Sequence, residues 1–275
     1  MSDREMSKDE ALEEAAQSPT ASASPPALAT ADLLRTAADP ALTEDFALAL
    51  LKRADLLPEV IEQLARNNNA LKSRKVKIAL ASHSKTPRHV SVPLARQFYT
   101  FDLMKVALSP TVPADVKVAV DDVLISRLKT VTIGERLTLA RRASGRVAAA
   151  LLLDMETIGS KITDTKTVAR ETRVMQAALE NTRLTEALVI NSVLRPGASA
   201  ALVHTVARHT KWSCRREIRA ALLRTEHLSL ARALEFSREI PTPLLHELLA
   251  ASRLPAQIKD QLLRESQASS PPASG

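Results

Sequence analysis

The chain contains an internal sequence repeat. Residues 174–190 align with residues 218–234 at an offset of 44, from Val174 to Ile218. The alignment pairs small and apolar residues in the same order: Ala177 with Ala221, Leu179 with Leu223, Leu184 with Leu228, and Ala187 with Ala231. A fixed period of this length is the sequence signature of stacked helical repeats. The alignment therefore predicts short helices that bury their apolar faces against neighbouring copies.

The composition favours an all-α chain. Five glycines in 275 residues leave little scope for the tight turns of β-hairpins. Alanine, leucine and arginine are abundant, and all three are good helix formers. Aromatic residues make up 2% of the chain, so we expect a core of Leu, Val, Ile and Ala side chains.

Helix starts recur along the chain. A Pro, Ser or Thr is followed three residues later by an apolar residue at Thr43, Pro58, Pro87, Pro113, Thr185, Ser199 and Pro255. Proline suits the first turn of a helix, and a hydroxyl caps it. Thr132 and Glu135 have the spacing of a capping box. These starts predict helices over 31–37, 43–53, 58–66, 73–82, 87–98, 101–108, 113–128, 132–142, 145–153, 173–180, 185–194, 199–209, 214–224, 229–238, 241–251 and 255–265.

The composition divides the chain into one domain and two tails. Residues 1–28 are acidic and rich in Ala, Ser and Pro, and residues 266–275 are polar, so both are predicted to be disordered. Residues 29–265 are predicted to form a single domain. Within it, residues 155–171 are polar and Thr-rich, which predicts an exposed loop inserted between repeats.

The corners between predicted helix pairs carry a resemblance. They read Ser109-Pro110-Thr111, Glu180-Asn181-Thr182 and Arg224-Thr225-Glu226. Over about residues 58–265 the chain resembles leucine-rich-variant and HEAT-like α-solenoid repeats. The resemblance implies an α-solenoid, a right-handed superhelix of short stacked helix pairs. Leucine-rich-variant proteins can hold an iron–sulfur cluster through cysteines; this chain has one cysteine, so no cofactor is carried over.

The charge of the chain points to anionic partners. The formal net charge is +7, but residues 1–30 hold six acidic and two basic residues, which leaves +11 for the rest. A basic body favours nucleic acid or an acidic protein surface, and the alternative is a solvated, arginine-rich surface. The longest apolar run, residues 147–153, is too short to span a membrane, and the acidic N-terminus does not read as a secretory signal. We therefore expect a cytoplasmic protein.

Cations stand before the first apolar residue of several predicted first helices. Free N–H groups at a helix start bind anions, and stacked repeats would align such ends along one edge. This predicts a cationic row that binds an anionic partner, with no metal and no catalytic residue. Its members are Lys72, Arg74, Lys75, Arg146, Arg173, Lys211, Trp212, Arg215, Arg216 and Arg219. In the alternative, the cations pair with acidic residues of the next repeat.

Trp212 has two interpretations. Beside four cations, its ring can stack on a base or hold a cation. Alternatively, it is a packing residue between repeats.

Two functions remain open, and a third fits poorly. The first hypothesis is a non-enzymatic binding scaffold for an acidic protein partner, and the second is a nucleic-acid-binding HEAT-like protein that grips phosphates through the cationic row. An enzyme of the HEAT-like DNA glycosylase kind needs aromatic and acidic residues in a pocket, and this chain supplies few aromatics. Cys214 with the nearby histidines lacks the orienting group that a nucleophilic pair requires.

Overall fold

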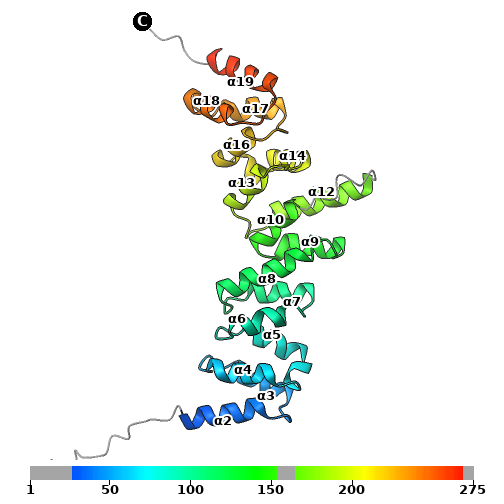
Figure 1. Cartoon of the computed structure of the whole chain (residues 1–275). Helices are drawn as coiled ribbons and strands as arrows, with labels where there is room; N and C mark the ends of the chain where they lie inside the picture. The colour runs from blue at the N-terminus through cyan, green and yellow to red at the C-terminus, as the bar shows by residue number, and fades with distance from the viewer. Residues whose placement is uncertain (1–26, 154–164, 269–275) are drawn as a thin grey trace, which may run out of the picture.

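The helices are stacked along one axis. The computed structural model describes residues 27–153 and 165–268, and in these ranges the chain forms seventeen α-helices, one short 3-10 helix and no strand. Figure 1 shows an elongated stack that runs from α2 at one end to α19 at the other. The prediction of an all-α chain is confirmed for this part of the protein.

The helix bounds follow the predicted starts closely. They are α2 (Ala27–Ala38), α3 (Glu44–Leu51), α4 (Pro58–Arg66), η2 (Ala70–Lys72), α5 (Arg74–Ser82), α6 (Arg88–Ala95), α7 (Thr100–Leu108), α8 (Ala114–Ser126), α9 (Ile133–Arg142), α10 (Gly145–Leu153), α12 (Thr165–Leu179), α13 (Glu186–Leu194), α14 (Ala200–Arg208), α15 (Thr210–Ser213), α16 (Arg216–Leu223), α17 (Leu230–Ser237), α18 (Thr242–Ala250) and α19 (Ala256–Ala268).

Local capping explains why the starts were predictable. The Thr43 hydroxyl accepts a hydrogen bond from the N–H of Phe46, and the hydroxyls of Thr185 and Ser199 act in the same way on α13 and α14. Thr132 and Glu135 form the predicted capping box at the start of α9. Each cap satisfies an N–H group that has no partner within its own helix.

The predicted loop over 155–171 is wrong for residues 165–171. This segment belongs to α12, which begins at Thr165 rather than near Arg173. Val168, Ala169 and Arg170 are exposed, whereas Glu171 and Met175 face the interior at helical spacing. Residues 155–164 lie outside the described ranges, as do 1–26 and 269–275. Both predicted tails run slightly too far inward, since α2 begins at Ala27 and α19 ends at Ala268.

Consecutive helices alternate between two columns. Contacts link α3, α5 and α7, and then α9, α12 and α14, in the first column. Contacts link α6, α8, α10, α13, α16 and α18 in the second column. A continuous core of Leu, Val, Ile and Ala side chains fills the space between the columns. This is the aliphatic core that the scarcity of aromatic residues predicted.

Polar side chains join the C-terminal ends of successive helices in a column. Asn67, after α4, donates hydrogen bonds to the carbonyls of Ala37 (3.0 Å) and Asp39 (2.8 Å) at the end of α2. The last carbonyls of a helix have no partner inside it, so a donor from the next layer satisfies them. The same arrangement recurs from His83 to Arg53 O, Thr111 to Ser82 O, Arg127 to Phe98 O, Trp212 to Leu179 O and Ser252 to Leu223 O.

These bonds set the spacing of the stack, which is not 44 residues. Asn67 and Asp39 are 28 residues apart, and Trp212 and Leu179 are 33 apart; the bonds of Asn181, which follows the long α12, bridge more, with Asn181 and Ala140 41 residues apart. The two aligned segments do bury the same positions, with Val174 and Ile218 both fully covered. However, α12 lies in the first column and α16 in the second. The offset of 44 residues leads from α12 past α13, α14 and the four-residue α15 to α16. The alignment therefore matches a helix of one column with a helix of the other.

Asn181 offers a direct test of these bonds. Its amide donates to the carbonyls of Ala140 (2.8 Å) and Ala143 (3.1 Å), and its oxygen accepts from the N–H of Arg183 (2.8 Å). Because the site is buried, Asn181→Ala leaves these groups without partners and should lower the free energy of unfolding by about 2–4 kcal/mol. Urea unfolding followed by circular dichroism measures the loss. Asn191→Ala, at an exposed position of α13, is the control, and an equal effect of the two variants would contradict the prediction.

Candidate binding surfaces

The predicted cationic row is divided between the two columns. Arg74 and Lys75 begin α5 in the first column, whereas Arg146 and Arg215 lie at the starts of α10 and α16 in the second. Arg173 lies in the middle of α12, not at a helix start. The prediction of one continuous row is therefore wrong. Its physical cause is the alternation of the columns, which an alignment of single helices does not detect.

Most cations of the row are held by acidic side chains of the neighbouring layer. Arg74 donates two hydrogen bonds to the carboxylate of Asp102, from Nε (2.7 Å) and from Nη2 (2.8 Å). Lys75 Nζ lies 2.9 Å from Glu44 Oε1, at the start of α3. The bond from Lys75, followed by one from Ser73, lowers the pKa of the Glu44 carboxyl, and Asp102 raises the pKa of Arg74.

The second column has the same kind of pairing. Arg146 Nη2 lies 2.8 Å from Asp122 Oδ1, and Arg215 Nη1 lies 2.7 Å from Glu186 Oε2. Arg219 is paired with Glu239 and also donates to the carbonyl of Ser213.

Beside the Arg146 pair, the buried carboxylate of Asp121 accepts a hydrogen bond from Ser144 at 2.8 Å. Burial raises the pKa of Asp121, against the opposing effects of the Ser144 hydroxyl and of Arg146.

The structure therefore favours the alternative in which the cations join layers. Five of the predicted cations, namely Arg74, Lys75, Arg146, Arg215 and Arg219, are ion-paired. Lys72, Arg173 and Arg216 are exposed and form no ion pair with another described residue. A phosphate backbone would meet paired charges along most of the predicted sites.

Trp212 is a packing residue. Its side chain is 1% exposed, and its Nε1 donates to the carbonyl of Leu179 at 2.8 Å. Lys211 Nζ lies 4.4 Å from the ring centroid and the Arg215 guanidinium 5.3 Å from it. The interpretation in which this ring stacks on a base is wrong, because almost none of the ring is accessible.

Sequence reasoning missed a set of exposed aromatic residues. Tyr99, the only tyrosine of the chain, is 70% exposed, and Phe46 and Phe101 are exposed as well. All three lie at the starts of first-column helices, where Tyr99 precedes α7 directly. A signal existed in the sequence: Tyr99 and Phe101 stand on either side of Thr100 at a helix start, and residues two positions apart point to opposite sides of a helix, so the two rings cannot share one buried face.

A hollow of about 430 Å³ lies beside these aromatic residues. It is formed by α3, α5 and α7 and contains both Arg74–Asp102 and Lys75–Glu44. The Arg74 guanidinium also lies 5.1 Å from the centroid of the Tyr99 ring. The full lining is Glu44, Ser73, Arg74, Lys75, Ile78, Asp102 and Lys105.

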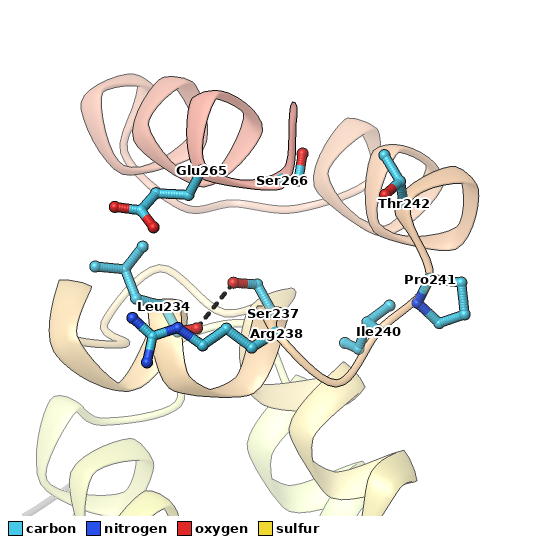
Figure 2. A pocket seen from close by; sticks show the side chains of 8 residues that line it. All are labelled: Leu234, Ser237, Arg238, Ile240, Pro241, Thr242, Glu265 and Ser266. Atoms are coloured by element: carbon cyan, nitrogen blue, oxygen red, sulfur yellow. Dashed lines mark hydrogen bonds between the residues drawn. The ribbon is translucent and has the colours of Figure 1, made fainter. Parts of the chain in front are cut away.

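Two further hollows lie toward the C-terminal half. The one between α12 and α14, about 490 Å³, is polar, and partial burial lowers the pKa of His209 within it. The other, about 300 Å³, lies among α17, α18 and α19. Figure 2 shows Arg238 and Glu265 on opposite sides of this opening, with the Ser237 hydroxyl donating to the carbonyl of Leu234 at 3.0 Å. None of the predicted site residues lines either hollow.

Within the described ranges, no group of three or more His, Cys, Asp or Glu side chains lies close enough to hold a metal ion. None of the described helices has the length and apolar character needed to cross a bilayer. Among protein-family models, curated proteins and solved structures, none matches this chain.

Proposed function

We propose that the chain is an α-solenoid that acts as a non-enzymatic binding scaffold for a partner protein with an acidic surface. Two columns of short helices, joined layer by layer, support the α-solenoid; its right-handed sense rests on the resemblance of its corners. Stacks of this kind expose an extended surface on which successive layers contribute equivalent positions. Such a surface suits a protein partner better than a small molecule.

One observation carries the choice of partner. The cations at helix starts are matched by carboxylates of the adjoining layer, as in Lys75–Glu44 and Arg215–Glu186. A surface of alternating charges with aromatic residues between them resembles a protein–protein interface, where Tyr and Arg are enriched. A polyanion gains affinity from unpaired cations that release its counterions, and paired cations supply less of this gain.

The non-enzymatic part of the proposal is supported by the contacts of the buried ionisable groups. Asp102 binds Arg74 of the preceding first-column helix, and Glu171 binds Arg136 of the preceding layer. Asp121 accepts from Ser144, next to the start of α10. Each of these groups joins two layers, so burial here serves packing rather than a reaction.

Nucleic-acid binding is the second candidate, favoured by the +11 net charge of residues 31–275 and by exposed Lys72, Arg173 and Arg216. Binding of a labelled DNA duplex across a salt series separates the candidates. Each phosphate contact adds about −0.9 to the slope of log affinity against log salt. If the chain is a scaffold for a protein, we expect the slope to correspond to fewer than about three phosphate contacts. Arg216→Ala should leave that slope unchanged, whereas a steep slope that falls by about one unit in this variant would replace the scaffold by the nucleic-acid function.

The partner itself requires a capture experiment. We expect the full chain, immobilised and incubated with an extract of its native cells, to retain an acidic protein after nuclease treatment. Reconstitution with that purified protein should give a defined complex at moderate salt. Retention that disappears with nuclease would contradict the scaffold.

A further inference from the structure

The starts of three first-column helices, α3, α5 and α7, form one edge of the stack. Lys75, at the start of α5, pairs with Glu44 at the start of α3. Arg74 pairs with Asp102 in the first turn of α7. The starts of α3, α5 and α7 therefore adjoin one another.

This edge concentrates exposed apolar side chains. We call it the aromatic edge and define it by the exposed residues Phe46, Tyr99 and Phe101. Each lies at the N-cap or within the first three positions of its helix. Half of the six aromatic residues of the chain are on this edge, in a protein that buries the other three. Large apolar groups gathered on a surface mark an interaction site.

The hollow beside the aromatic edge has a small positive charge. Three cations and two carboxylates line it, which gives a formal charge of +1. Arg74 and Lys75 are paired with the two carboxylates, whereas Lys105 forms no ion pair with another described residue. Lys105 follows Phe101 by four positions on α7, so both lie on the same face of that helix. A single carboxylate is the complement of this arrangement.

Tyr99 is held in place before any partner arrives. The Arg74 guanidinium lies 5.1 Å from the ring centroid, and Asp102 fixes that guanidinium through two hydrogen bonds. Asp102 is itself buried, so its carboxylate anchors the guanidinium that lies beside the ring. A tyrosine with few conformations left to lose, beside an arginine, has the properties of a binding hot spot.

We propose that the aromatic edge binds an extended segment of a partner protein that carries a carboxylate next to apolar side chains. The carboxylate contacts Lys105, and the apolar side chains pack on Tyr99 and Phe101. This proposal rests on the scaffold function and names the site at which it acts. Protein is favoured over nucleic acid, because two of the three cations of the hollow are already paired, whereas a phosphate backbone gains its affinity from several unpaired cations.

Peptide display tests the segment directly. A library of short random peptides is selected on the full chain, and enriched peptides are synthesised for titration by fluorescence anisotropy. We expect enrichment of Asp or Glu beside Leu, Phe or Trp. Tyr99→Ala should weaken the binding of these peptides by about tenfold or more. Lys105→Glu should weaken them similarly and restore binding when their acidic residue is changed to lysine.

The controls separate this site from the rest of the surface. Lys129→Glu makes the same charge change at an exposed position beyond the C-terminal end of α8 and should leave the peptide affinity unchanged. Circular dichroism verifies the folding of every variant. Enriched peptides that bind Tyr99→Ala as well as the original chain would overturn the aromatic edge, while the scaffold function would survive at another surface. A library without enrichment would overturn the edge as well.

Other occupants give distinct results. A labelled single-stranded oligonucleotide that binds more tightly than the peptides and loses affinity in Tyr99→Ala would identify nucleic acid and overturn the proposal. A synthetic peptide of residues 1–26, which are acidic, would overturn the partner assignment if it outcompeted the enriched peptides at this edge. We expect neither probe to displace them.

Discussion

Glu171→Ala should lower the free energy of unfolding by about 3–5 kcal/mol. Glu171 of α12 lies 3.1 Å from Arg136 of α9, and each side chain is 7% exposed. The pair joins two successive layers of the first column. The variant removes the carboxylate that lies 3.1 Å from the buried Arg136 guanidinium, and breaking a buried ion pair by removing one partner is costly.

Urea unfolding measures this loss of stability, and two further variants identify its cause. Glu180→Ala removes an exposed carboxylate just beyond the end of the same helix and should change the stability by less than about 0.5 kcal/mol. The double replacement Arg136→Met with Glu171→Leu should recover most of the loss, because an apolar pair of similar size avoids the desolvation cost. A Glu171→Ala protein as stable as the original would show that the pair is solvated.

Trp212→Ala should cost about 3–5 kcal/mol of stability. The ring is buried and its Nε1 donates to Leu179 O at the end of α12, so truncation creates a cavity and leaves a carbonyl unsatisfied. Trp212→Phe keeps most of the volume and loses the hydrogen bond, so its cost should be about 1–2 kcal/mol. Thermal unfolding of the two variants separates packing from hydrogen bonding.

Trp212 also reports on its own environment, because it is the only tryptophan of the chain. The native protein should show blue-shifted emission that acrylamide quenches poorly, and unfolding should remove both properties. Addition of oligonucleotide should leave the emission unchanged. Efficient quenching in the native state would contradict the packing role.

Glu171 also shows why the composition of residues 155–171 led to a wrong prediction of a loop. A window rich in Thr, Lys and Arg reads as a loop, yet seven of its residues, 165–171, are helical. The structure buries one charged residue of that window against Arg136, and the pair replaces the apolar contact that periodicity analysis searches for. A buried ion pair has no signature in hydrophobic patterning, because its partner lies 35 residues earlier in the chain, between Arg136 and Glu171.

The sequence by itself determined that the described chain is helical and where most helices begin. Thr43, Thr132 and Ser199 cap the N–H groups of residues three positions later, so the information is local and readable without a fold. Of the aligned apolar pairs, Ala177/Ala221, Leu179/Leu223 and Leu184/Leu228 are buried as predicted, whereas Ala187 and Ala231 are both exposed. Short-range capping and periodicity therefore suffice for these features.

The tertiary structure alone decided which helices share a column and which charges are paired. Lys75 meets Glu44, 31 residues earlier, and Arg74 meets Asp102, 28 residues later. Both contacts depend on how consecutive helices alternate, which no local pattern encodes. The same alternation separates the predicted cations and gathers Tyr99, Phe101 and Phe46 on one edge. The sequence shows which side chains are charged. Whether two of them neutralise each other depends on the distance between them, which the packing of the helices sets.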